Sequence, residues 1–143
     1  EPDPHMRRRA QKRASNLDLD IHIRPDPAES LPYEDDSIAV VVASLVFCTI
    51  PDVETALDEV ARVLEPGGEL HVLEHVAATG WTSRLQTALT PVWRRAAAGC
   101  HLDRDTGRTL RNHDRLSVSE LRTLDLGVPP VTPFVRGTLT VEE

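Results

Sequence analysis

The chain has 143 residues, about the length of one domain. Its 16 basic and 23 acidic side chains give a formal net charge of -7 at pH 7. This argues against a nucleic-acid-binding surface spread over the molecule, because phosphates attract the opposite sign. A hydrophobic fraction of 40% and a charged fraction of 27% are typical of a globular chain, and no apolar run approaches the roughly 18 residues that span a bilayer.

Two cysteines, Cys48 and Cys100, are too few for a disulfide framework and lack the CxxC spacing of a metal or redox motif. Cys48 closes an apolar run, so we interpret it as a buried small hydrophobe, and Cys100 as a free structural thiol. No basic and apolar leader opens the chain. We therefore expect a soluble protein of a reducing compartment, the cytoplasm, with no bound metal.

The first predicted element is a helix over residues 4–15, with Pro4 in its first turn. Five basic side chains crowd residues 7–13 of this helix. They form either a small anion or nucleic-acid patch or the solvated face of a surface helix. The lack of interleaved aromatic residues favours the solvated face. After the helix, apolar and polar residues alternate over Leu19–Ile23, which predicts a short, half-buried strand.

Residues 38–76 predict a strand, a helix and a second strand. The β-branched run Ile38–Phe47 is typical of a strand buried on both faces of a parallel sheet. Asp52 is the expected N-cap of a helix with apolar residues at helical spacing, which a Pro-Gly-Gly turn at residues 66–68 ends. The next strand covers Glu69–Val76. This βαβ unit predicts parallel strands joined by a right-handed crossover.

The remaining segment contains two predicted helices and one or two strands. The helix Thr82–Ala98 has an apolar stripe and a proline that should kink or split it, and Asp103–His113 forms a further short helix. Residues 116–126 fit either a helix that starts with a capping box or a strand. Val131–Val141 is predicted as the terminal strand. The apolar stripe of the helix Thr82–Ala98 consists of Leu85, Leu89, Val92 and Ala96.

Several stretches of this sequence resemble class I S-adenosylmethionine-dependent methyltransferases. LPYEDDSIAVVVASLVF (Leu31–Phe47) resembles the loop and fourth strand of that family, and ALDEVARVLEPGGELHVLEHV (Ala56–Val76) resembles its helix, Pro-Gly-Gly turn and fifth strand. GCHLDRDTGRTLR (Gly99–Arg111) and PFVRGTL (Pro133–Leu139) resemble a branch that contains thiol, phospholipid and quinone methyltransferases. The resemblance implies an α/β, Rossmann-like, mostly parallel sheet with a terminal antiparallel strand, and it favours a strand over residues 117–124.

Two features depart from the pattern of the family. Ala39 stands where the fourth strand of the family usually has an aspartate, and the glycine-rich loop that holds the cofactor is absent, since no GxG occurs. By this alignment the chain begins just after the second strand. We therefore expect residues 1–143 to be a partial methyltransferase domain that lacks the first strand and the glycine-rich loop.

The resemblance implies a cofactor site for S-adenosylmethionine. Glu1 would accept hydrogen bonds from the ribose diol, as carboxylates at strand ends do in dinucleotide-binding folds, or it is only an exposed terminal residue. Ala28 and Glu29 would frame the adenine. The end of the fourth strand would line the crevice in which such sheets bind ligands. Its residues are Ser44, Leu45 and Val46, of which Ser44 is alternatively a plain strand-end residue.

Glu74 and His75, at the end of the fifth strand, would face the methyl acceptor. One of them would act as general base if the acceptor must lose a proton, while the alternative for His75 is a structural role. The stretch HVLEH at residues 71–75 also matches the H-x-x-E-H motif of zinc peptidases. On a strand, however, its histidines lie roughly 13 Å apart at about 3.3 Å per residue, too far to share one zinc ion.

The expected function is transfer of a methyl group from S-adenosylmethionine to a small acceptor, a thiol or a lipid- or quinone-like molecule, and not to nucleic acid. The alternatives are a non-catalytic remnant that serves as an interaction module, and a nucleic-acid-binding accessory domain based on residues 7–13. Because Ile38–Phe47 would lack its neighbouring strand, we expect the isolated chain to bind the cofactor weakly, to turn over no substrate and to self-associate. The sequence leaves the oligomeric state open.

Overall fold

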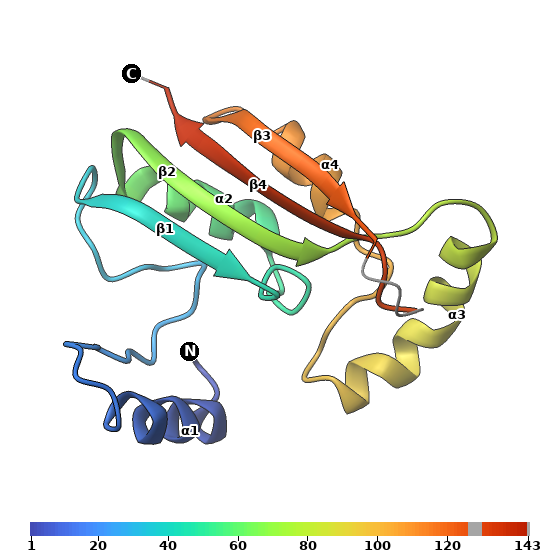
Figure 1. The fold of residues 1–143 in the computed structure, drawn as a ribbon, viewed down its shortest axis with the longest axis horizontal. Helices are drawn as coiled ribbons and strands as arrows, with labels where there is room; N and C mark the ends of the chain where they lie inside the picture. Colours follow the sequence, from blue (N-terminus) through green and yellow to red (C-terminus); the bar gives the residue numbers. More distant parts are fainter. Residues whose placement is uncertain (126–129, 143) are drawn as a thin grey trace.

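The computed structural model describes residues 1–125 and 130–142, which form helices and strands in the order shown in Figure 1. The helices of these residues are α1 (Pro4–Ala14), α2 (Val53–Val63), α3 (Gly80–Ala96) and α4 (Thr106–Arg111). The strands are β1 (Ile38–Ser44), β2 (Leu64–His75), β3 (Leu116–Leu124) and β4 (Phe134–Val141).

The strands form one sheet in the order β1-β2-β4-β3. β1 pairs in parallel with β2, from Val40 opposite Glu69 to Ser44 opposite Leu73. β4 lies antiparallel between β2 and β3, so β1, β2 and β3 share one direction and the terminal strand opposes them. The predicted βαβ unit, the mostly parallel sheet and the antiparallel terminal strand are confirmed. Residues 116–124 form a strand and not a helix; Leu126 lies outside the described residues.

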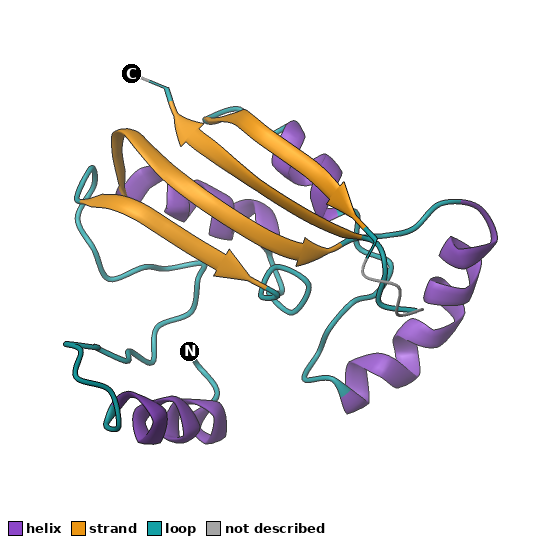
Figure 2. Cartoon of the chain, in the orientation of Figure 1, coloured by secondary structure: helices purple, strands orange, loops and turns teal. Residues whose placement is uncertain are grey.

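The core lies on one side of this sheet, between the strands and the helices α2 and α4 (Figure 2). Asp52 caps α2 as predicted, because its side chain accepts a hydrogen bond from the Thr55 amide at 3.1 Å. The apolar face of α2 packs on the inward side chains of the strands. Fully buried members of this core include Leu57, Leu64, Leu70, Leu110 and Leu139.

The other side of the sheet is bare at β1. The exposed fractions of Val40 and Val42 are 51% and 73%, whereas Ala43 is buried in the core. β1 is an edge strand, paired within the described residues only with β2. The prediction that Ile38–Phe47 is buried on both faces is therefore wrong, since one face has no covering layer. The strand also ends at Ser44, three residues earlier than predicted.

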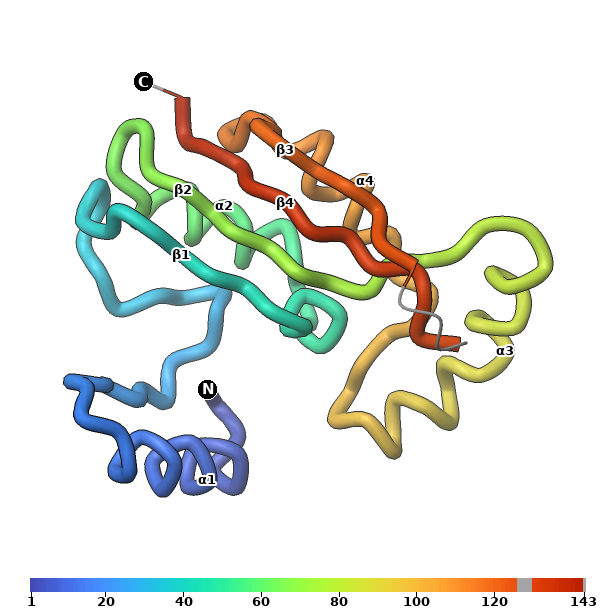
Figure 3. Tube along the Cα trace, in the orientation of Figure 1, coloured from blue at the N-terminus to red at the C-terminus, as the bar shows by residue number. Residues whose placement is uncertain are grey.

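Two sequence predictions fail where an apolar pattern has no partner. Leu19–Ile23 is not a strand: its alternating residues follow α1 in an irregular segment away from the sheet, with no neighbour to complete a ladder (Figure 3). In α3 the predicted apolar stripe is exposed, and Val92 is 67% accessible. The buried residues of α3 are instead Gln86 and Thr90, and the Gln86 amide bonds to backbone groups of residues 78, 130 and 132.

Gly137 allows β3 and β4 to approach closely. A Cβ atom at this position would meet the Glu120 carbonyl oxygen well inside contact distance and would lie 2.7 Å from Leu121 Cδ1. Gly137→Ala should therefore lower the free energy of unfolding by about 1–3 kcal/mol, the usual cost of overpacking. Urea unfolding measures this, with Gly107→Ala as control, since a Cβ there would meet only side-chain atoms at 3.3 Å or more. Equal stability of the two variants would contradict this account.

Candidate active site at the carboxyl end of β1 and β2

The chain turns sharply where β1 ends. The Leu45 amide still donates to the Leu73 carbonyl of β2 at 2.8 Å, but its φ of 55° takes the backbone into the left-handed region, which ordinary side chains rarely adopt. The next residues leave the sheet. As a result Leu45 and Val46 project apolar side chains that are 47% and 40% exposed, next to Ser44 at the strand end. The structure thus brings together the three residues predicted to line the cofactor crevice.

Glu74 fixes this turn from the neighbouring strand. Its Oε1 atom accepts hydrogen bonds from the amides of Val46 at 2.6 Å and Phe47 at 3.1 Å. The side chain is fully buried, and its Oε2 atom has no partner among the described residues. Burial raises the pKa of the Glu74 carboxyl, while the two amides lower it. Glu74 is therefore directed into the loop after β1 and is closed to solvent. A carboxylate that faces a methyl acceptor would instead be open to the site.

Arg104 holds the same loop through its carbonyl groups. Its guanidinium donates from Nη1 to the carbonyl oxygens of Phe47 and Ile50, both at 2.6 Å. The His101 amide donates to the Cys48 carbonyl at 2.9 Å. Residues 45–50 are thus fastened from β2 on one side and from the segment between α3 and α4 on the other.

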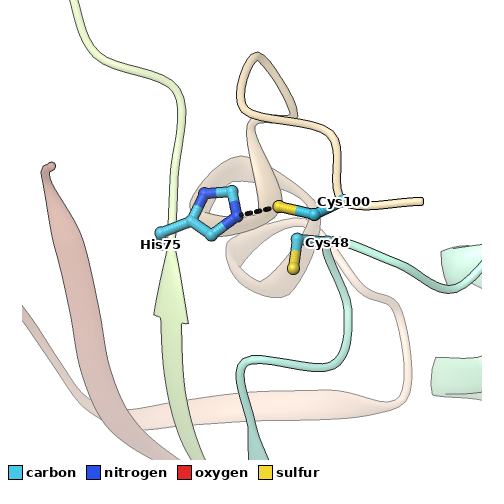
Figure 4. A group of neighbouring side chains, drawn as sticks. All are labelled: Cys48, His75 and Cys100. Carbon is cyan, nitrogen blue, oxygen red and sulfur yellow. Dashed lines mark hydrogen bonds between the residues drawn. The ribbon is translucent and has the colours of Figure 1, made fainter. Parts of the chain in front are cut away.

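His75 ends β2 and is 3% exposed. Its Nε2 atom lies 2.9 Å from Cys100 Sγ (Figure 4). Its ring also packs edge-on against Phe134. Burial lowers the pKa of His75, which favours the neutral imidazole at pH 7. Burial and the neighbouring Cys100 raise the pKa of the Cys48 thiol, so this thiol is protonated at the same pH. The structure shows both cysteines buried and free, as the sequence predicts, but it also brings them beside His75, which the sequence does not.

Ala28 and Glu29 lie beside the segment that joins β1 to α2. Ala28 packs against the core, and Glu29 Oε1 accepts a long hydrogen bond of 3.4 Å from the Asp52 amide at the start of α2. Glu1 contacts the chain shortly before Ala28. Its amino group donates to the Arg24 carbonyl at 3.0 Å, and its Oε1 atom accepts from the Asp3 amide at 3.0 Å. Glu1 thus lies against the segment that leads into Ala28.

An open hollow of about 650 Å³ lies on the bare side of the sheet. Ser44 borders it together with polar side chains of the other strands, among them His71, Arg122 and Arg136. His71 bonds to Thr138 at 3.0 Å and pairs with Glu69 at 2.9 Å. Because residues 71–75 are part of β2, the H-x-x-E-H spacing does not place its two histidines on one helical turn, and the rejection of the zinc-peptidase motif is confirmed.

Comparison with known proteins decides the family. The methyltransferase domain family matches residues 1–72, half of the chain. The chain belongs to the class I S-adenosylmethionine-dependent methyltransferases. Human thiol S-methyltransferase TMT1A is 38% identical over 104 residues, which are 71% of this chain and 41% of the relative. Human thiol S-methyltransferase TMT1B is 31% identical over 143 residues, 96% of this chain and 59% of the relative.

Solved structures agree with this methyltransferase fold. The YcgJ protein from Bacillus subtilis superposes with a TM-score of 0.76 at 15% identity, over 100% of this chain and 81% of that one. A SAM-dependent methyltransferase from Methanosarcina mazei gives 0.72 at 17% identity, over 99% and 80%. The chain spans about 41% to 59% of the length of the two human relatives. Within the residues that the structure describes, no helix is long and apolar enough to cross a membrane.

Replacing Glu74 should loosen the turn after β1. Glu74→Ala leaves two amides without their acceptor, and we expect it to lower the free energy of unfolding by about 2–4 kcal/mol. Glu74→Gln keeps a carbonyl oxygen and should cost about half as much or less. Urea unfolding and hydrogen exchange at the Val46 and Phe47 amides measure both effects. Glu65→Gln, an exposed carboxylate on the same strand, is the control; unchanged exchange in Glu74→Ala would contradict this role.

Proposed function

We propose that the protein containing this chain transfers a methyl group from S-adenosylmethionine to a small thiol. The observation that carries the proposal is the 31% identity with human thiol S-methyltransferase TMT1B, which extends over 96% of this chain and includes the turn after β1 and the end of β2. A structural feature supports the choice of cofactor. The carboxyl end of a parallel strand pair, where α/β sheets bind ligands, presents exposed apolar side chains at Leu45 and Val46.

These residues suit the cofactor. Leu45 and Val46 offer apolar contact to an adenine or to the methylene groups of the donor, and Ala28 is small enough to let a flat ring approach. Glu29 and Glu1 supply carboxylates that accept hydrogen bonds from amino or ribose hydroxyl groups. When bound, S-adenosylmethionine supplies the activated methyl group, so this chain has to orient donor and acceptor and exclude water.

Methyl transfer to a thiol needs little acid–base chemistry from the protein. In our proposal the acceptor sulfur would form a bond to the methyl carbon while the carbon–sulfur bond of the donor breaks, and the thiol proton would leave to solvent. A thiol with a pKa of about 8.5 is already partly ionised near neutral pH. In our proposal Glu74 therefore acts as a positioning residue, which holds residues 46 and 47 at the strand end. His75, one residue further along β2, is also buried, and its ring contacts Cys100 and Phe134, so in our proposal neither residue acts as a general base.

A second acceptor class has support from one relative. The demethylmenaquinone methyltransferase of Lactobacillus johnsonii is 34% identical over 77 residues, half of this chain. A quinol is, like the thiols, a small and partly apolar nucleophile. The thiol is favoured because the identity with the thiol methyltransferases extends over more of the chain.

The acceptor is tested with the protein in its complete reading frame. We expect labelled methyl groups from S-adenosylmethionine to appear on alkyl or aryl thiols at least tenfold faster than on phenols, quinols or nucleic acid. Preferential labelling of quinols would support the second acceptor class, and labelling of nucleic acid would overturn both. Binding of neither cofactor nor acceptor would instead support a non-catalytic remnant of the family.

Glu1 provides a test of the cofactor site. If its carboxylate accepts hydrogen bonds from the ribose, Glu1→Gln should weaken S-adenosylmethionine binding about tenfold or more, because a hydrogen bond to a charged group is worth about 1.5–3 kcal/mol. Calorimetric titration measures the change in Kd. Glu34→Gln, an exposed carboxylate in the loop before β1, should leave it unaltered. An equal loss in both variants would assign the effect to overall charge.

A further inference from the structure

Three side chains that no single sequence motif connects meet behind the end of β2. Cys48 comes from the loop after β1, His75 from the last position of β2, and Cys100 from the segment after α3 (Figure 4). Their two sulfur atoms and an imidazole nitrogen all lie within 4.8 Å of one another. The exposed fractions of the three residues are 3%, 3% and 7%. The cluster is therefore compact and shielded from bulk water.

The donor atoms are sulfur and nitrogen, with no oxygen among them. Thiolate sulfur and imidazole nitrogen are the ligands that zinc prefers, while magnesium and calcium require oxygen, which this cluster lacks. Zinc–sulfur bonds of about 2.3 Å and zinc–nitrogen bonds of about 2.0–2.1 Å place tetrahedral ligand atoms about 3.5–3.8 Å apart. The distance of 2.9 Å between His75 Nε2 and Cys100 Sγ is a hydrogen-bond contact, so metal entry requires these two atoms to separate by about 0.6 Å.

The backbone already holds the three ligands in place. The Cys48 carbonyl accepts from the His101 amide at 2.9 Å, which joins the two cysteine-bearing segments directly. The Cys100 amide donates to the Ala97 carbonyl at 3.0 Å, and the His75 ring is packed edge-on against Phe134. Metal binding to such a cluster needs small side-chain movements and no refolding, which lowers the entropic cost of assembling the site.

We propose that Cys48, His75 and Cys100 form a zinc-binding site. On binding, two zinc–sulfur bonds and one zinc–nitrogen bond form, both thiols release their protons to solvent, and a water molecule completes the tetrahedron. Cys₂His with an exogenous fourth ligand is a known zinc donor set. The metal links the loop after β1, the end of β2 and the segment after α3, which otherwise meet only through hydrogen bonds and packing. This site is independent of the identity of the methyl acceptor.

Cobalt titration tests the site by an absorption signal that does not depend on enzyme activity. The purified chain, reduced and kept under nitrogen, should bind one equivalent of Co²⁺ with intense sulfur-to-cobalt charge-transfer absorption and tetrahedral d–d bands, and Zn²⁺ should displace it. Cys48→Ala, Cys100→Ala and His75→Ala should each weaken binding at least tenfold, since even outer-shell changes cost about 10–100-fold. His101→Ala, which removes an imidazole next to Cys100 but outside the cluster, should bind cobalt normally.

A second measurement needs no variant and so does not depend on how the variants fold. In the unaltered chain, Zn²⁺ should protect Cys48 and Cys100 together from alkylation by iodoacetamide in denaturant-free buffer, and a chelator should remove the protection from both. Metal protection of only one cysteine would overturn the three-ligand site. A reduced, folded chain that takes up neither cobalt nor zinc would also overturn it.

Discussion

The carboxylate of Glu74 fixes the place where the chain leaves the sheet after β1, and the arrangement of this end of the molecule depends on it. A fully buried carboxylate is unfavourable unless hydrogen bonds replace its hydration, and the amides of Val46 and Phe47 supply two of them. Those amides would otherwise be unpaired where the ladder between β1 and β2 stops. The Oε1 atom of Glu74 and the two loop amides therefore satisfy each other, and removing either partner leaves the other buried and unpaired.

The same turn determines what the strand end presents to solvent. Leu45 adopts a left-handed backbone at φ 55°, a conformation that persists only where the surroundings enforce it. Glu74 enforces it from one side and Arg104 from the other, through the carbonyls of Phe47 and Ile50. Two apolar side chains are consequently held at the end of a parallel strand pair. This rigid presentation of apolar contact is what a site for a large, flat cofactor group requires.

The sequence predicts those parts of the fold that depend on local patterns. The β-branched run at the start of β1 and the Asp52 cap lie within a few residues of the elements they define, and the structure confirms them. The predicted Pro-Gly-Gly turn is wrong: α2 already ends at Val63, and residues 66–68 lie inside β2, where its register with β1 shifts. Prediction fails where a pattern depends on a distant partner. Leu19–Ile23 alternates like a strand but has no neighbouring ladder, and α3 buries Gln86 because backbone groups of residues 78, 130 and 132 need its amide.

The candidate site shows the same division. The strand ends at Ser44 and His75 place the predicted residues at one edge of the sheet, which follows from parallel pairing alone. By contrast, no spacing rule relates Cys48 to Cys100, which are 52 residues apart and meet only because the segment after α3 returns to the loop after β1. The direction of the Glu74 side chain is likewise a tertiary outcome: position on a strand assigns a face, but unpaired amides nearby decide what the carboxylate binds.

The Glu74 contact and the meeting of Cys48 with Cys100 both act on the loop after β1. They would therefore couple the proposed cofactor site to the proposed metal site. Cys48 directly follows Phe47 and lies two residues from the exposed Val46. The Phe47 amide donates to Glu74, and the Phe47 carbonyl accepts from Arg104. A metal on Cys48 would therefore restrict the same backbone that holds the exposed side chains of Leu45 and Val46, the contacts proposed for the cofactor. Ordering this loop once lowers the entropic cost of the second binding event, and linkage makes that effect equal in both directions. The short loop between β1 and α2 would thus be the physical connection between the two proposed sites.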